Sequence, residues 1–145
     1  MTDAKSNYLE GGLVGLIFNA TSILNLAQDS SGGGASDIVV ALHTANPGET
    51  GLQNTSECAY TSYARTKVAR TTLGWVVTTL GVASPSTNIT FPQATGGTET
   101  VSHASVSLST ASTADLLYYA TVTPNISLSN GVTPRLTTAF TISET

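Results

Sequence analysis

The sequence predicts an all-β chain, a jelly-roll-like antiparallel β-sandwich of about eight strands preceded by one amphipathic helix. Three observations favour this fold class. Ser and Thr account for 42 of the 145 residues, and only 10% of the residues are charged, against roughly 25% in an ordinary soluble domain. Short segments with apolar runs or period-two alternation recur along the chain, as strands require. Gly, Pro and Asn clusters separate these segments at the spacing of a sandwich.

We expect the helix near the start of the chain, from about Tyr8 to Ala20. Asn7 is its predicted N-cap, and Glu10 three residues later forms a variant of the capping box. Three glycines in this span weaken the isolated helix, so it must depend on packing. Its apolar face is expected either to close one open end of the sandwich or to pack against another protomer or a larger assembly. The residues of this face are Leu9, Leu13, Leu16, Ile17 and Ala20.

A division of the chain is predicted after residue 36. Residues 1–36 are expected to form the helix and a flexible arm, because Ser30–Ser36 is rich in Ser and Gly. Residues 37–145 are expected to form the β-sandwich, and the whole chain is expected to be a single structural domain. The Gly-rich arm precedes a strand, whereas a phosphate-binding loop follows a strand and opens a helix, which argues against a nucleotide site.

The centre of the predicted sandwich is the segment from Asp37 to Arg70. Ile38–Leu42 is a continuous apolar run and predicts a strand that is buried on both faces. Asn46-Pro47-Gly48 then predicts a turn, since Pro lacks a backbone donor and Gly tolerates a positive φ. From Tyr60 the alternation returns, which predicts a second long strand that continues to Arg70.

Further strands are predicted along the rest of the chain, with turns at Ser84-Pro85-Ser86 and Asn130-Gly131. The strand that begins at Thr98 alternates Ala, Val and Leu with polar residues, which predicts one buried face and one solvent-exposed face. The predicted strands are Trp75–Leu80, Asn88–Phe91, Thr98–Leu108, Asp115–Val122, Pro124–Leu128 and Leu136–Ile142.

Several segments form a recognisable set of motifs. The most distinctive is the turn from His43 to Gly51, which reads His-Thr-Ala-Asn-Pro-Gly-Glu-Thr-Gly. The others are Tyr63-Ala64-Arg65, Ile89-Thr90-Phe91-Pro92, Val101-Ser102-His103, Leu116-Leu117-Tyr118 and Gly131. Together they resemble a family of small tailed-bacteriophage virion proteins that are often described as tail-fibre-like. The resemblance covers nearly the whole chain and implies a structural part of a phage particle, while the absence of heptads or internal repeats argues against a long fibre shaft.

The charge and hydropathy of the chain restrict its partners. Its formal net charge is −4, whereas a nucleic-acid-binding protein needs a basic surface, so no nucleic-acid partner is expected. The longest apolar helical stretch, Leu13–Phe18, is too short to cross a bilayer, so no membrane partner is expected. A surface with few charges favours large and permanent protein contacts, because few ions lose their hydration when the surface is covered.

Three of the five basic residues lie close together in the sequence, at Arg65, Lys67 and Arg70. One interpretation is that these charges protect an edge strand from aggregation. The other is a contact strip for an acidic partner such as a capsid shell. Both interpretations place the three side chains at the surface of one strand.

A candidate subunit contact is the pair Leu117 and Tyr119. Both faces of the predicted strand from Asp115 to Val122 carry apolar side chains, so both faces need cover. Either another subunit covers this pair, or the first helix or a loop does. The helix residues that are added to the candidate subunit contact are Leu13, Leu16 and Ile17.

The sequence offers no constellation for catalysis or metal binding. His43 and His103 are the only histidines and Cys58 is the only cysteine, with no spacing typical of a zinc site. There is no Gly-x-Ser-x-Gly motif and no paired arrangement of carboxylates. We therefore expect no enzyme activity, no cofactor and no metal, and His43 is expected to hydrogen-bond the backbone of the turn that follows its strand.

Capsid decoration is the function that these observations favour. We expect a protein that is made in the host cytoplasm, binds the major capsid protein on the exterior of the virion and stabilises the shell as a cement protein. It is expected to act as a symmetric homo-oligomer, of which a trimer is the simplest form. The alternative is a structural or host-binding module of the tail or baseplate, with Trp75 or Tyr118-Tyr119 as an aromatic platform.

Overall fold

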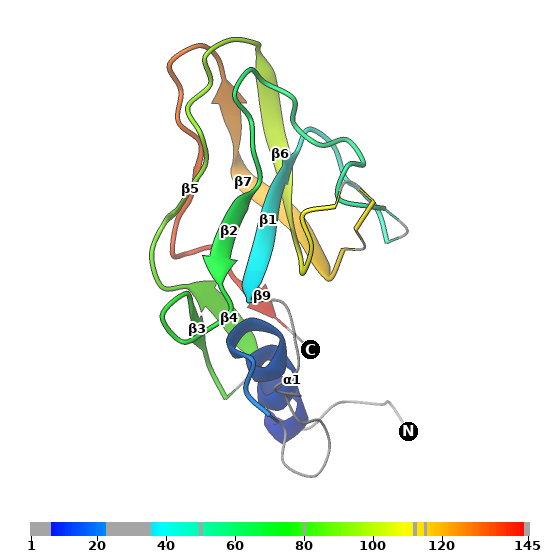
Figure 1. The fold of residues 1–145 in the computed structure, drawn as a ribbon, viewed down its shortest axis with the longest axis vertical. Coiled ribbons are helices and arrows are strands. Elements are labelled where there is room, and N and C mark those ends of the chain that lie inside the picture. Colours follow the sequence, from blue (N-terminus) through cyan, green and yellow to red (C-terminus); the bar gives the residue numbers. More distant parts are fainter. Residues whose placement is uncertain are drawn as a thin grey trace. The chain divides into compact units, whose positions relative to one another are not determined.

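The computed structural model describes residues 7–22, 36–49, 51–79, 81–111, 113–114 and 116–143 of the chain (Figure 1). The chain divides into two compact units, each assembled from separate segments. The first unit contains Met1–Asp37, Val68–Asn88 and Leu136–Thr145, and the second contains Ile38–Lys67 and Ile89–Arg135. Most of the predicted flexible arm lies outside the described residues, and the division of the chain after residue 36 stays a prediction.

The predicted fold class is confirmed. The described part of the chain contains nine strands and one short helix, which comes first. The strand pairings are antiparallel, as between β1 and β6, β3 and β4, β4 and β9, and β6 and β7. The strands form three sheets, of four, three and two strands. The jelly-roll-like arrangement expected from the sequence has eight strands in two sheets.

The largest sheet has the strand order β2-β1-β6-β7. Its strands are β1 (Asp37–His43), β2 (Thr66–Ala69), β6 (Glu99–Ser107) and β7 (Tyr118–Leu128). β1 lies between β2 and β6, and every residue from Ile38 to His43 is buried. The prediction of a strand covered on both faces is therefore confirmed.

β6 is buried on both faces in its second half, so the prediction of one solvent-exposed face is wrong. Ala104 and Val106 are fully buried, but Ser105 and Ser107 are also only 1% exposed. The polar face of β6 is not exposed to solvent, because other polar side chains cover it. His43 of β1, for example, hydrogen-bonds Ser105 there. Alternation of apolar residues with Ser therefore does not distinguish a solvent-exposed face from a buried polar one.

β7 is one long strand where the sequence predicts two. Its pairing with β6 is interrupted, because Val101 pairs with Ile126 whereas His103 pairs with Thr121. Residues 122–125 of β7 thus lie opposite a single residue of β6, which makes a large bulge. This bulge contains the cis peptide bond between Thr123 and Pro124. Bulges and Pro at a sheet edge hinder pairing with further strands, and β7 is an edge strand of this sheet.

Two predicted strands are shorter than the alternation suggests. The long strand expected from Tyr60 is reduced to β2, because Ser62 has a φ of 76° and Tyr63 N–H donates to the Tyr60 carbonyl in a turn. The closing strand is split into β8 (Arg135–Leu136) and β9 (Ile142–Ser143). A turn at Thr137–Phe140 separates them. β8 pairs with β5 (Ile89–Thr90), which confirms the strand predicted at that place.

The first unit combines a three-stranded sheet with the helix. The sheet has the order β3-β4-β9, where β3 is Trp75–Val77 and β4 is Val82–Pro85. β4 replaces the turn that the Ser-Pro-Ser sequence predicts. Pro85 is accommodated because it stands at the end of β4, opposite Trp75, where the missing backbone donor does little harm.

The helix α1 (Asn7–Asn19) packs against β3 and β4 (Figure 1). The helix prediction is confirmed, but its buried face differs from the expected one. Val14 and Phe18 are fully buried, and the ring centroids of Phe18 and Trp75 lie 4.6 Å apart. Leu13, Leu16 and Ile17 are half-buried, and Ala20 adopts a φ of 52° just after the helix. The buried face therefore passes through Gly11, Val14, Gly15 and Phe18, and a Cβ at Gly11 would lie 3.0 Å from the Thr79 carbonyl oxygen.

Candidate functional site

The three predicted basic contact residues have different surroundings. Lys67 lies within β2 and is exposed, whereas Arg65 and Arg70 flank this strand and are half-buried. The two arginines do not lie in the strand, so the expectation of one basic strip along it is not met. Each arginine instead makes contacts within the chain.

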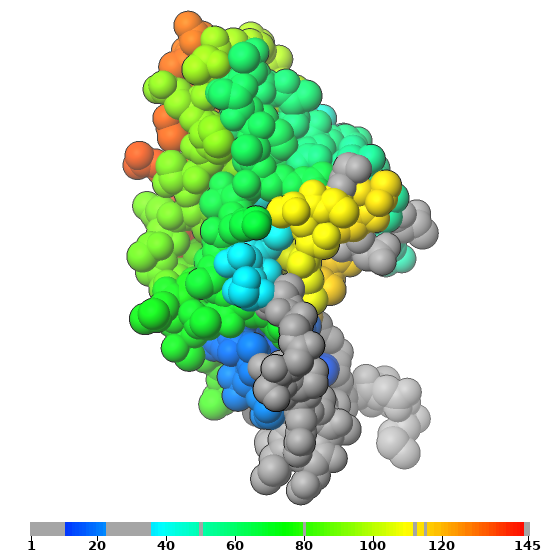
Figure 2. Space-filling model, viewed as in Figure 1, coloured from blue at the N-terminus to red at the C-terminus, as the bar shows by residue number. Residues whose placement is uncertain are grey.

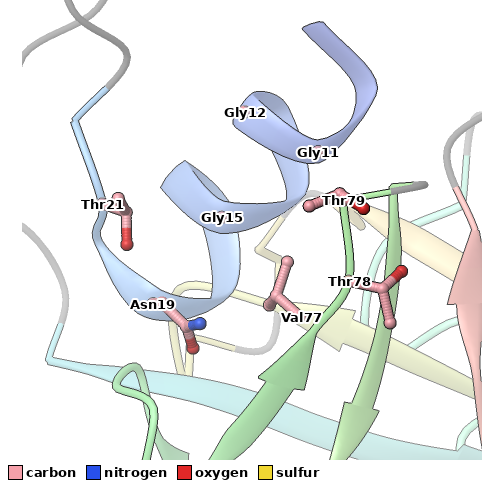
Figure 3. A pocket seen from close by; sticks show the side chains of 8 residues that line it. All are labelled: Gly11, Gly12, Gly15, Asn19, Thr21, Val77, Thr78 and Thr79. Carbon is pink, nitrogen blue, oxygen red and sulfur yellow. The ribbon is translucent and has the colours of Figure 1, made fainter. Parts of the chain in front are cut away.

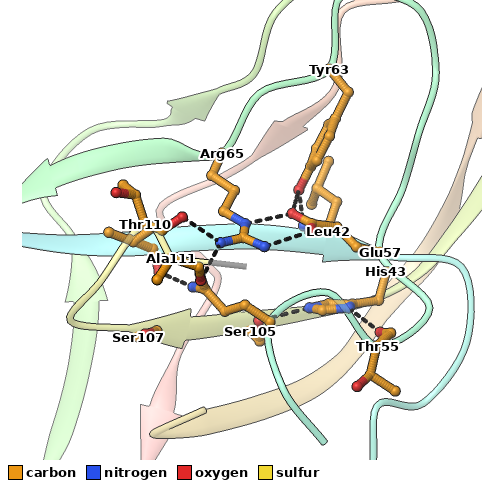
Figure 4. Close-up of polar contacts among 12 residues, drawn as sticks. Leu42, His43, Thr55, Glu57, Tyr63, Arg65, Ser105, Ser107, Thr110 and Ala111 are labelled. Atoms are coloured by element: carbon orange, nitrogen blue, oxygen red, sulfur yellow. Dashed lines mark hydrogen bonds and ion pairs between the residues drawn. The ribbon is translucent and has the colours of Figure 1, made fainter. Parts of the chain in front are cut away.

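Arg65 forms a two-pronged ion pair with Glu57 (Figure 4). Its Nε donates to Glu57 Oε1 at 2.6 Å and its Nη2 donates to Oε2 at 2.7 Å. The two side chains are only 11% and 15% exposed. The hydrogen bonds from the guanidinium to the Glu57 carboxylate raise the pKa of Arg65. Planar, paired contacts of this kind are the strongest that Arg makes with a carboxylate.

The third nitrogen of Arg65 holds a surface segment. Its Nη1 donates to the carbonyls of Thr110 and Ala111, each at 2.9 Å. These residues follow β6 and are exposed, and they belong to the segment coloured yellow in Figure 2. Arg65 therefore ties the segment after β6 to the loop that carries Glu57.

Tyr63 connects this ion pair to the central strand. Its hydroxyl donates to Glu57 Oε1 at 2.9 Å and accepts a hydrogen bond from the Leu42 N–H at 3.0 Å. Burial raises the pKa of Tyr63, and the neighbouring Glu57 adds to this shift. Tyr63, Arg65 and Glu57 therefore form one hydrogen-bonded cluster against β1.

Arg70 caps the end of α1. Its Nε and Nη2 donate to the carbonyls of Ile17 and Leu16, in the last turn of the helix. These carbonyls have no partner within a helix, and a cation is favourable near this end of the helix dipole. The last turn of α1 itself contains no basic residue, so Arg70 supplies this charge from a distant segment.

His43 lies at the centre of a second polar cluster, and it is fully buried. Its Nδ1 lies 2.9 Å from the carbonyl of Thr55, and its Nε2 lies 2.7 Å from Ser105 Oγ (Figure 4). Because a carbonyl only accepts, Nδ1 carries the proton and Nε2 accepts from the serine hydroxyl. Burial lowers the pKa of His43, so the neutral ring is favoured. The sequence predicts that His43 hydrogen-bonds the backbone of the turn after its strand, but its backbone partner is Thr55, in the loop beyond that turn.

No reactive or metal-binding centre is found among the described residues. Cys58 is a buried free thiol, and burial together with the neighbouring Glu99 raises its pKa to about 12, so it is a poor nucleophile. No group of three His, Cys, Asp or Glu residues in the described ranges could hold a metal ion. Within those ranges no helix is both long and apolar enough to cross a bilayer.

The first unit contains a shallow cavity of about 360 Å³, open to solvent, beside the glycines of α1 (Figure 3). Figure 3 shows the three glycines along the helix, with Val77 and Thr79 next to them. None of the residues that line the cavity is charged. They are Gly11, Gly12, Gly15 and Asn19 of α1, Thr21 after the helix, Val77 of β3, and Thr78 and Thr79 after this strand.

Exposed apolar side chains are found at predicted and unpredicted positions. Of the predicted subunit contact, Leu117 is 39% exposed and Tyr119 is half-buried. Leu73 and Val76 are more exposed than Leu117, at 87% and 51%, and neither was predicted from the sequence. The exposure of Val76 could have been predicted from strand alternation. If Trp75 is buried, its neighbour Val76 lies on the other face of β3. The predicted contacts stay predictions, while Trp75 is fully buried and cannot form an exposed aromatic platform.

The residues of the His43–Gly51 motif that the structure describes, 43–49 and 51, form a tight turn with a clear physical basis. Asn46 Oδ1 accepts a hydrogen bond from Gly48 N–H at 2.8 Å, and Gly48 has a φ of 76°. A Cβ at Gly51 would lie 2.1 Å from the carbonyl oxygen of Pro47. Asn46 therefore stabilises the turn through its side chain, Gly48 allows the positive φ, and Gly51 allows the close approach of the backbone.

Residues 4–142 match one protein-family model, which is described as podophage GP4 fiber I protein gp80. The chain belongs to this family. The predicted resemblance to small virion proteins of tailed phages is thereby confirmed. None of the curated proteins matches the sequence.

Membership of the gp80 fiber I family gives the chain a structural role in a phage virion. The matched residues include segments of both units, so the family feature is the whole fold rather than a single motif. The His43–Gly51 turn, the Arg65 cluster and the Arg70 cap all lie within the matched range. Their contacts are internal, so in this family member they stabilise the fold.

Proposed function

We propose that the chain is a component of a fibre assembly on the virion, attached at the tail, that acts by binding other virion proteins. The family match over residues 4–142 carries this proposal, because that family is described as a fibre protein. The absence of heptads and repeats in the sequence favours a compact module within such an assembly over an extended shaft.

The proposed role does not include enzyme activity. His43 and Ser105 are hydrogen-bonded, but both are buried and their contacts are made within the fold. A substrate would need access to such a pair. The composition supports a structural role as well, since a surface with few charges loses little hydration energy when another protein covers it.

Capsid decoration is the second candidate. The observation that favours it is the charged fraction of only 10%, which suits a protein that covers many equivalent sites on a shell. Binding to the major capsid protein in its assembled form would then stabilise the shell by mass action. A symmetric oligomer, of which a trimer is the simplest form, would strengthen many weak contacts through multivalency.

Copy number and location separate the two candidates. Virions are purified, heads are separated from tails, and the chain is quantified in each fraction by mass spectrometry against the major capsid protein. The fibre proposal predicts a few copies or a few tens of copies per particle, recovered with tails. Recovery with heads at a constant ratio to the capsid protein would reject the fibre proposal and support decoration. Absence from both fractions would reject both.

A further inference from the structure

His43 links the end of β1 to a tight turn in the second unit. Its Nδ1 donates to the Thr55 carbonyl at 2.9 Å (Figure 4). Thr55 in turn closes the segment Leu52–Thr55, because its N–H donates to the Leu52 carbonyl and its hydroxyl accepts from the Leu52 N–H, each at 2.9 Å. We call Leu52–Thr55 the covering turn. The histidine ring is fully buried, and the covering turn helps to shield it from solvent.

His43 can take up a second proton only at Nε2. This nitrogen accepts a hydrogen bond from the Ser105 hydroxyl at 2.7 Å. Once it is protonated, Nε2 becomes a donor, and the hydroxyl of Ser105, which is 1% exposed, has to find another acceptor inside the fold. A charged ring without water is also costly unless a counter-charge lies close to it. The closed arrangement is therefore built around the neutral ring.

The charged groups around His43 do not offset the cost of a positive ring. Burial lowers the pKa of His43 from 6.5, and the nearby Arg65 and His103, its pairing partner on β6, lower it further. The Thr55 carbonyl and Glu57 act in the opposite direction, but both oxygens of the Glu57 carboxylate already accept from the Arg65 guanidinium. The covering turn contains no titratable residue. A neutral ring is therefore favoured while the turn is closed.

The closed turn also carries backbone strain and an unsatisfied polar atom. Ser56, which follows the turn, has a φ of 52°, a conformation that residues other than Gly rarely adopt. Gln53 is fully buried, but its Oε1 has no hydrogen-bond partner in the described part of the chain, and its Nε2 lies 3.4 Å from the Val39 carbonyl. Opening of the turn would let water reach this amide and let Ser56 return to a common φ. Such a segment is a favourable place for local opening, which needs less free energy than global unfolding.

We propose that His43 and the covering turn form an acid-sensitive latch, in which proton uptake by His43 opens the turn while the sheet stays folded. Ser56 is the hinge, and Glu57 beyond it stays paired with Arg65. In the open form the charged ring reaches water, so protons bind more tightly to the open form and shift the equilibrium towards it. The latch changes the surface that the second unit presents to a partner, whichever part of the virion the chain occupies.

Hydrogen exchange of the full chain, followed by NMR between about pH 7 and about pH 5, tests the latch. The amide of Gln53 reports opening, because it donates to the Ala114 carbonyl at 3.0 Å. Its exchange rate is divided by the intrinsic rate at each pH, which gives the ratio of open to closed forms. Below about pH 6.5 this ratio is expected to rise by up to about tenfold for each pH unit, the limit for one proton. A ratio that stays constant down to about pH 5 overturns the proposal.

The central amides of β6 show whether the opening is local. Protection of the Gln53 amide should stay at least about tenfold below that of these strand amides at every pH, because the turn opens without the sheet. Equal protection of the turn and of β6 would mean that only global unfolding exposes the turn, which contradicts the latch.

Two matched variants assign the effect to His43. His43→Gln keeps a polar side chain that takes up no proton, so exchange of the Gln53 amide should no longer depend on the opening proton, whatever its level. His103→Gln removes the neighbouring histidine and should retain the dependence on pH. Circular dichroism checks that both variants are folded. A dependence that persists in His43→Gln, or that disappears in His103→Gln, rules out the proposed latch.

The hinge provides a test that leaves the histidine unchanged. Ser56→Gly removes the strain of the positive φ, so protection of the covering turn should rise by roughly twofold to fivefold at every pH, with the same dependence on pH. Asn54→Gly is the matched control, because Asn54 is an exposed residue of the turn without a positive φ, and it should give no gain. A Ser56→Gly turn that is no better protected than the wild-type turn contradicts the stored strain on which the latch depends.

Discussion

The two units of the chain achieve burial by different means. The first packs aromatic rings and glycines, with Phe18 against Trp75 and Gly11 close to the backbone of Thr79. The second buries polar groups that satisfy one another, around His43 and around the Arg65–Glu57 pair. Apolar packing is sensitive to volume, whereas buried polar clusters are sensitive to charge and geometry. The two units should therefore respond to different perturbations.

The largest effect is expected from removing an aromatic ring in the first unit. Phe18→Ala should lower the free energy of unfolding by about 3–5 kcal/mol, because it leaves a cavity next to Trp75. Guanidinium denaturation followed by fluorescence measures this, since Trp75 is the single tryptophan and is retained. Val76→Ala, at an exposed position of β3, should change stability by only about 0.5 kcal/mol. Equal effects of the two variants would contradict the packing described for α1.

In the second unit, the comparable test is loss of the Arg65 guanidinium. Arg65→Met keeps most of the side-chain stem but removes the guanidinium donors of two carbonyls and of the Glu57 carboxylate, which retains its hydrogen bond from Tyr63. We expect a loss of about 2–3 kcal/mol, measured by the same denaturation. Lys67→Met is the matched control, and it should alter stability by less than about 0.5 kcal/mol because Lys67 is exposed. If both variants cost the same, the Arg65 cluster does not stabilise the fold as proposed.

Acid should weaken the second unit through His43. Its pKa is lowered from 6.5 in the folded state by burial, so the unfolded chain binds more protons below that pH. The free energy of unfolding should therefore be constant above about pH 6.5 and fall as the pH drops from there towards the folded pKa. His43→Gln should remove this part of the slope, whereas His103→Gln should retain it. A slope that survives in His43→Gln would assign the acid sensitivity to another group.

The smallest effects come from a pair of glycines in α1. A Cβ at Gly15 would meet Thr21 Cβ at 3.8 Å, an ordinary contact, so Gly15→Ala should raise stability by up to about 1 kcal/mol. A Cβ at Gly11 would lie 3.0 Å from the Thr79 carbonyl oxygen. Gly11→Ala should therefore be destabilising despite the same gain in helix propensity. Thermal melting of the two variants in parallel compares them, and equal stabilisation would show that α1 is not closely packed at Gly11.

The parts of the fold that the sequence predicts are those that local patterns determine. The apolar run Ile38–Leu42, the first helix and the Asn130-Gly131 turn each depend on a few adjacent residues. Helix α1 also illustrates the limit of such patterns. Its leucines suggest one buried face, but tertiary contact with Trp75 selects the glycine-containing face through Val14 and Phe18.

The candidate contacts were harder to predict because their surroundings come from distant segments. Arg65 pairs with Glu57 and with the segment after β6, and Arg70 caps a helix more than fifty residues earlier. Charge spacing along one segment carries no information about such partners. The most exposed apolar residue, Leu73, was missed because exposure depends on the turn that presents it rather than on its neighbours in sequence.

Electron microscopy of intact virions with a gold-labelled antibody against this chain tests the proposed role most directly. We expect gold at the tail, on the fibre assembly, in wild-type particles and none in particles that lack the gene. Gold distributed evenly over the head would contradict the fibre role and indicate that the protein binds the capsid. Particles that bind no antibody at the tail or the head would also contradict its role as a fibre component.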